Sequence, residues 1–226
     1  MRHFRLMFMS LLLITLSVSG CDLIEETLFG GGDEPSITIA PSTLSRYDGL
    51  RQGVDENGLP MLGVADAPVQ IQIFSSFGCP PCRFFSEDNM DTIIDAARAG
   101  ELSYIYVPMQ TGGIPNVVGA NAAAMCASEQ GAFFQFHDAL FYFAQRYGND
   151  AFTESRFRAA ANDLMLDMDM FESCLDEGRF NDPIDNAIQL AVDLNISATP
   201  TLVSGDTQVV ASESELMSIL TRAGGG

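Results

Sequence analysis

A pair of cysteines stands where a buried strand is predicted to meet a helix, and this arrangement constrains the fold more than any other feature of the sequence. Residues 69–74 form an apolar, strand-like run that ends in a Ser-Ser-Phe-Gly turn, directly before Cys-Pro-Pro-Cys at residues 79–82. A helical pattern follows over 80–99, and residues 102–107 predict a second strand. Because a helix joins the two strands, we expect them to be parallel. The core is therefore predicted to be α/β.

The rest of the chain predicts a helical block and a closing hairpin. Apolar residues at helical spacing recur in several segments between about residues 117 and 194. Strand patterns return at 201–203 and 208–210 around a Ser-Gly-Asp turn, and a final helix follows. We expect one folded domain over residues 59–226, with the helical block inserted into the sheet.

The first twenty residues read as an export signal. Arg2 and Arg5 precede an apolar run over 6–16, which is shorter than the roughly 20 residues needed to span a bilayer. Val-Ser-Gly-Cys at residues 18–21 resembles the bacterial lipobox, in which the cysteine is lipidated after cleavage. Residues 1–20 are thus predicted to be a lipoprotein signal peptide, with lipidation at Cys21. The alternative is ordinary cleavage, which would leave Cys21 as a spare thiol or remove it.

Residues 21–58 are predicted to be a flexible, lipid-anchored tether. They are acidic, contain a Gly-Gly-Gly run and two prolines, and show no sustained apolar period. The chain has five cysteines, an odd number that fits poorly with an oxidising compartment unless one of them is set aside. If Cys21 is lipidated, the four remaining cysteines can form two pairs.

The spacing of Cys79 and Cys82 suits thiol-disulfide exchange. The first cysteine would lie at the start of a helix, where backbone N–H groups and the helix dipole stabilise a thiolate, so Cys79 is the expected nucleophile. Cys82 would lie one turn further on, close enough to form a disulfide with it. Half a zinc site has the same spacing, but no second close pair of Cys or His accompanies it, so we favour redox chemistry and predict no metal.

Five longer motifs, at residues 62–69, 74–82, 126–133, 136–141 and 197–202, carry a family resemblance that covers about residues 59–222. They resemble the DsbA-like disulfide oxidoreductases, which have a thioredoxin fold with an inserted helical subdomain. This resemblance implies a thioredoxin-like α/β fold whose helical insertion falls at about residues 117–194. It also implies a protein thiol-disulfide oxidoreductase that needs no cofactor.

The resemblance further assigns four residues outside the cysteine pair. Thr199 and Pro200 match a cis peptide that faces the cysteines and contacts the substrate chain. Cys126 and Cys174 resemble a second, structural disulfide of some relatives. A second redox pair and two buried free thiols remain the alternatives for these cysteines, and His137 is read as a structural histidine.

Two departures from the family pattern leave the direction of electron flow open. Ile73 stands where many relatives place a buried acid that moves protons to and from the buried cysteine. The Pro80–Pro81 dipeptide stands where the strongest oxidants have a histidine that stabilises the thiolate. Both departures would make the disulfide less oxidising.

We therefore expect an exported, cell-envelope lipoprotein that oxidises the thiols of substrate proteins. A reductase of the same fold is the first alternative, and a non-catalytic tethered module that binds a peptide or a soft metal is the second. The expected partners are substrate proteins, an unidentified membrane redox protein and the membrane itself, and we expect a monomer. Nucleic acid is excluded because the net charge is −19.

Overall fold

The computed structural model describes residues 45–223, which contain a six-stranded mixed sheet. The strands are β1 (Gln52–Val54), β2 (Pro60–Gly63), β3 (Val69–Ser75), β4 (Leu102–Pro108), β5 (Thr201–Ser204) and β6 (Thr207–Val210). Their order across the sheet is β1-β2-β4-β3-β5-β6. The central strands β3 and β4 are parallel, as expected, and the other neighbouring pairs are antiparallel.

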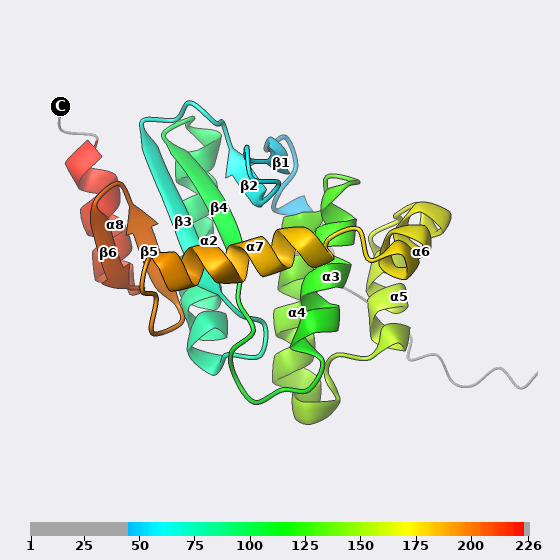
Figure 1. The fold of residues 1–226 in the computed structure, drawn as a ribbon. Helices are drawn as coiled ribbons and strands as arrows, with labels where there is room; N and C mark the ends of the chain where they lie inside the picture. Colours follow the sequence, from blue (N-terminus) through cyan, green and yellow to red (C-terminus); the bar gives the residue numbers. More distant parts are fainter. Residues whose placement is uncertain (1–44, 224–226) are drawn as a thin grey trace, which may run out of the picture. The chain divides into compact units, whose positions relative to one another are not determined.

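The helices fall into three groups along the chain (Figure 1). Helix α2 connects β3 to β4, a block of helices stands between β4 and β5, and α8 follows the β5–β6 hairpin. The helices are α2 (Pro80–Arg98), α3 (Val117–Ser128), α4 (Phe133–Tyr147), the 3-10 turn η1 (Gly148–Asp150), α5 (Glu154–Asp163), α6 (Met168–Glu177), α7 (Asn181–Asp193) and α8 (Glu213–Ala223). This order is the predicted α/β arrangement with a helical insertion.

Alternating side chains of the sheet enter two cores on its opposite faces. Ile71 and Ile73 of β3 belong to the larger core, which also contains residues of α2 and α8. Phe74 of β3 belongs to the smaller core, which it shares with Ala187 and Ala191 of α7. The sheet is therefore a middle layer, with α7 crossing one face and α2 lying against the other (Figure 1).

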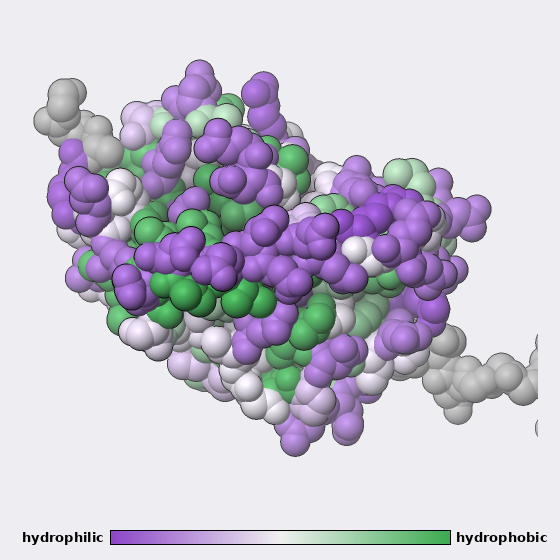
Figure 2. Space-filling view, in the orientation of Figure 1, coloured by the Kyte–Doolittle hydropathy of each residue, from purple (hydrophilic) through white to green (hydrophobic). Residues whose placement is uncertain are grey.

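Helix α7 is amphipathic, which explains why it covers the sheet. Ile184, Ala187 and Ala191 are buried at helical spacing. In Figure 2 the outer surface of α7 is mainly hydrophilic, and hydrophobic residues gather beside it. Ala187 and Ala191 thus fix the helix on the sheet, while Ile184 enters the larger core.

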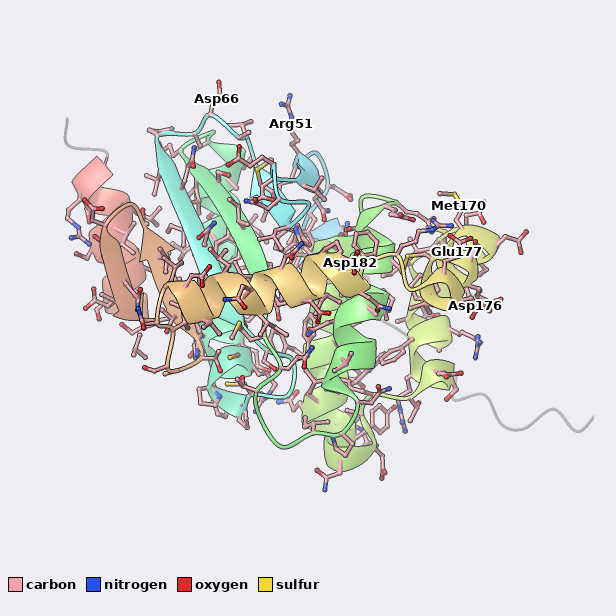
Figure 3. All side chains as sticks on the ribbon, in the orientation of Figure 1. Arg51, Asp66, Met170, Asp176, Glu177 and Asp182 are labelled. Atoms are coloured by element: carbon pink, nitrogen blue, oxygen red, sulfur yellow. A yellow bond between two sulfur atoms is a disulfide. The ribbon has the colours of Figure 1, made fainter. Side chains whose placement is uncertain are left out.

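The outer side of the insertion carries many of the acidic residues. Asp176 and Glu177 of α6 and Asp182 of α7 are exposed; Figure 3 shows Asp176 and Glu177 at α6, and Asp182 at the start of α7. The N-cap of α6 is Asp167, whose side chain accepts a hydrogen bond from the Met170 N–H.

Residues 45–58, which were expected to belong to the tether, pack on the folded domain in the structure. Tyr47 is 2% exposed, and its hydroxyl donates to Asp138 of α4. Arg46 bridges Asp138 and Asp91 of α2, and β1 pairs with β2. From the sequence, docking of residues 47–50 was one possibility, but a three-residue strand and one buried aromatic ring leave no apolar period that would show it. The remainder of the predicted tether, the signal peptide and Cys21 lie outside the described residues.

Among the helices of residues 45–223, none combines the length and the apolar character needed to cross a membrane.

Candidate active site

Cys79 is the N-cap of α2, and Cys82 lies in the first turn of that helix. Strand β3 ends at Ser75, and the turn that follows is closed by the Cys79 N–H, which donates to the Ser76 carbonyl at 3.2 Å. Pro80 and Pro81 occupy the first helical positions, where the absence of an N–H leaves no backbone donor unpaired. The sequence thus places both sulfur atoms at the positive end of a 19-residue helix.

Both thiols are free and almost fully buried. Cys79 is 7% exposed and Cys82 is 1% exposed. An incoming sulfur reaches Cys79 more readily than Cys82. This difference makes Cys79 the cysteine that exchanges with a partner and Cys82 the cysteine that closes or leaves the disulfide.

The segment before β5 brings Thr199 and Pro200 against Cys79, although 120 residues separate Thr199 from that cysteine. The Thr199–Pro200 peptide bond is cis. The Thr199 hydroxyl donates to Cys79 Sγ at 3.3 Å, and the Cys79 thiol can donate to the Thr199 carbonyl at 3.4 Å. The structure therefore brings together the predicted cysteine pair and the predicted substrate-binding residues, Thr199 and Pro200.

Contacts within the site separate the acidities of the two thiols. The pKa of Cys79 is lowered to about 6, first by a hydrogen bond from the Cys82 thiol and then by the Thr199 hydroxyl and the Cys82 N–H, against the opposing effect of burial. The pKa of Cys82 is raised, first by burial and then by its hydrogen bond to Cys79. At neutral pH the reduced pair therefore holds a Cys79 thiolate beside a Cys82 thiol.

Polar groups other than a carboxylate surround Cys82. Ile73, at the position where the family pattern has an acid, is 1% exposed and packs in the larger core. Besides Cys79, the Ser76 backbone and the Ser75 hydroxyl interact with Cys82, and both lower its pKa. The Tyr106 hydroxyl lies beside Ser75 and is buried without a partner at hydrogen-bond geometry.

The loop between β4 and α3 closes the site from another side, and sequence reasoning did not identify it. The Ser76 hydroxyl donates to the Thr111 carbonyl at 2.7 Å. Gly112 has φ +97°, and a Cβ placed on it would lie 1.8 Å from the carbonyl oxygen of Gly78. The Gly-Gly sequence at 112–113 was the only available signal, and it indicates a turn without indicating what the turn contacts.

Cys126 and Cys174 form a disulfide between α3 and α6, within the insertion. This is the pairing that the family resemblance implied. Both residues are buried, at 2% and 0% exposure. The bond therefore ties two helices that contact each other through an apolar interior.

His137 lies in an aromatic cluster of the larger core. It is 2% exposed, its Nδ1 is 3.0 Å from Asp138 Oδ1, and its ring meets Phe77 and Tyr106 edge to face. These contacts agree with a structural histidine. Across residues 45–223, no three or more His, Cys, Asp or Glu side chains gather in a way that would hold a metal ion.

Known proteins with similar sequences and structures share this architecture. A family model described as thioredoxin matches residues 56–221, which is most of the chain. Disulfide bond formation protein D of Bacillus subtilis (strain 168) is 26% identical over 156 residues, which cover 66% of this chain and 68% of that protein.

Two solved structures extend the comparison to the fold. Oxidised BdbD from Bacillus subtilis has a TM-score of 0.65 at 21% identity, covering 78% of this chain and 99% of that one. MdbA of Corynebacterium diphtheriae, a thiol-disulfide oxidoreductase, has a TM-score of 0.62 at 16% identity, covering 79% and 98%. The thioredoxin-like fold class with a helical insertion is confirmed. From its family match, its relatives and its buried Cys-Pro-Pro-Cys pair at the start of α2, the chain belongs to the thioredoxin family and is a DsbA-like thiol-disulfide oxidoreductase.

Proposed function

We propose that this protein is an extracytoplasmic oxidase of substrate protein thiols, with the Cys79–Cys82 disulfide as its oxidising group. The observation that carries this proposal is the lowered pKa of Cys79, about 6, beside the raised pKa of Cys82. Stabilising the thiolate stabilises the reduced pair, and a pair whose reduced form is stabilised is an oxidant. The asymmetry thus favours transfer of electrons from the substrate to this protein.

The reaction would proceed in two exchange steps. A substrate thiolate attacks Cys79 Sγ, the Cys79–Cys82 bond breaks, and Cys82 leaves as a thiolate that takes up a proton. A second substrate thiolate then attacks the substrate sulfur of the mixed disulfide, and Cys79 leaves as a thiolate. The substrate loses two electrons and gains a disulfide, while the pair gains the same two electrons.

Pro200 and Thr199 would orient the substrate chain in this proposal. Their cis peptide lies against Cys79, the sulfur that a substrate would attack. Cys82, at 1% exposure, is shielded from the same attack. A substrate chain that approaches along this segment would therefore meet Cys79 first.

An export signal and lipidation at Cys21 would place the domain in the cell envelope, facing the periplasm or the exterior. The Cys126–Cys174 disulfide supports an oxidising compartment, since such bonds are rare where thiols are kept reduced. An oxidase of this kind needs a membrane redox protein to reoxidise Cys79 and Cys82. We propose that the protein acts as a monomer on substrate proteins.

The test is the reduction potential of the Cys79–Cys82 pair. The full-length protein is equilibrated with glutathione buffers, and alkylated thiols are counted by peptide mass spectrometry. A potential between about −120 and −180 mV, the range of DsbA and protein disulfide isomerase, supports the oxidase. A potential near about −270 mV, as in thioredoxin, overturns the direction and favours the reductase, which the apolar Ile73 also favours.

A further inference from the structure

A second threonine hydroxyl stands behind the one that contacts Cys79. Thr111 Oγ1 lies 2.7 Å from Thr199 Oγ1, and Thr199 Oγ1 in turn lies 3.3 Å from Cys79 Sγ. Thr111 comes from the loop between β4 and α3, whereas Thr199 precedes β5, and 88 residues separate the two. Two hydroxyls from distant segments therefore form one line that ends on the reactive sulfur.

The protons available on these groups determine which hydroxyl donates and which accepts. A hydroxyl has one proton to donate, and a thiolate can only accept. When Thr199 donates its proton to the Cys79 thiolate, the contact of 2.7 Å with Thr111 requires Thr111 to be the donor. When Cys79 is protonated, its thiol can donate to the Thr199 carbonyl, and the Thr199 hydroxyl is free to turn toward Thr111. The charge on the sulfur thus decides which way the two hydroxyls point.

Thr111 is held in place from both sides. The Ser76 hydroxyl donates to the Thr111 carbonyl and accepts from the Thr111 N–H at 3.3 Å. The same oxygen accepts from the Gly78 N–H, so one serine joins the loop to the active-site turn. The next residue, Gly112, touches the Gly78 carbonyl so closely that no Cβ fits there. A hydroxyl on this backbone is preorganised and does not have to be ordered when the thiolate forms.

We propose that Thr111 is a positioning residue for Cys79, whose hydroxyl orients and polarises the Thr199 hydroxyl so that it donates to the Cys79 thiolate. Burial raises the pKa values of two neighbouring titratable groups, Cys82 and Tyr106, and keeps both neutral, so neither supplies a competing charge. Hydrogen bonds in a chain strengthen one another, so the loss of the outer hydroxyl weakens the inner bond. The proposal deepens the exchange function proposed for Cys79, but it concerns an ionisation that is measurable whichever way electrons flow.

The test measures the Cys79 ionisation in a double-mutant cycle on the reduced full-length protein. Alkylation of the peptide that contains Cys79 is followed by mass spectrometry as a function of pH. Thr111→Val is expected to lower the Cys79 ionisation constant about twofold to tenfold, a rise in pKa of about 0.3 to 1 unit. Thr111→Ser, which keeps the hydroxyl, is expected to retain the original value. Thr92→Val, on α2 about 15 Å along the helix from Cys82, is the matched control and should change nothing.

The cycle separates a positioning role from a merely structural one. In a Thr199→Val background, Thr111→Val is expected to have no further effect on the Cys79 pKa, because the group through which it acts is gone. An unchanged pKa in Thr111→Val, or an equal shift with and without the Thr199 hydroxyl, overturns the proposal. If Thr111→Val does not fold, as judged by circular dichroism, Thr111→Ala serves in the same cycle with the same expected outcomes. If the double-mutant cycle gives the expected result but the reduction potential of the Cys79–Cys82 pair is near that of thioredoxin, the proposed oxidase function is refuted and the role of Thr111 stands.

Discussion

Removing Cys82 tests the electrostatic basis of the proposed chemistry, because its thiol is the first cause of the low pKa of Cys79. In Cys82→Ala the thiolate loses this donor but keeps the Thr199 hydroxyl. A hydrogen bond to a charged group contributes about 1.5–3 kcal/mol, and one pKa unit corresponds to about 1.4 kcal/mol. The pKa of Cys79 is therefore expected to rise by about one to two units from about 6. With a pKa of about 7 to 8, between about one half and nine-tenths of the Cys79 thiol would be protonated at pH 7.

The assay is the rate of Cys79 alkylation against pH in the reduced protein, read on the peptide that contains it. Cys82→Ser keeps a hydroxyl donor and is the matched control, with an expected pKa nearer that of the unchanged protein. A Cys79 pKa in Cys82→Ala that equals or falls below the original value would refute the reasoning. In that case the helix dipole and the backbone, which the variant leaves intact, would account for the acidity.

The same ionisation links the stability of the reduced protein to pH. A free cysteine has a pKa of about 8.5, so between about pH 6 and 8.5 the unfolded chain binds a proton that the folded chain has lost at Cys79. The free energy of unfolding is therefore expected to rise with pH across this window, and the gain is lost as the pH falls through the folded pKa. The oxidised protein has no thiol at this position and should show no such slope. Urea unfolding of both forms at several pH values measures the difference, and parallel curves would contradict the low pKa.

Three further variants test the framework that holds the site. Replacing both Cys126 and Cys174 by Ala opens a loop with a sequence separation of 48 and should lower the free energy of unfolding by about 4 kcal/mol in urea titrations, whereas an unchanged midpoint would refute a stabilising role. Tyr47→Phe removes a buried hydrogen bond to a carboxylate of α4 and should cost about 1.5 kcal/mol by the same measurement, and no loss would mean that the N-terminal segment is not docked in solution. Gly112→Ala should lower the free energy of unfolding by about 1–3 kcal/mol and slow substrate oxidation, because φ is +97° and the added Cβ would meet the active-site turn. Gly113→Ala, where nothing lies within 4 Å of the added atom, is its control, and equal effects of the two would contradict the close contact.

The order of the catalytic elements was determined by the sequence itself. A buried strand, a turn, two cysteines around two prolines and a long helical pattern are local signals, and the structure has them as β3 and α2. The hairpin of β5 and β6 follows from its turn residues in the same way. Apolar periodicity and turn chemistry act over a few residues, so a single sequence is sufficient to locate such elements.

The family resemblance already assigned Thr199 and Pro200 to a position facing the cysteines, but only the tertiary structure decided which groups support them. Thr111 and Ser76 come from segments other than that of Thr199, and contacts among these three residues span up to 88 residues. The docking of Tyr47 on α4 is of the same kind, since one buried ring and one hydroxyl leave no pattern in the residues around them. A polar side chain has the same local signature whether it faces water or a thiolate. Its partner is set by how the sheet, the insertion and the cis-proline segment pack together, and this long-range packing is what local sequence patterns do not encode.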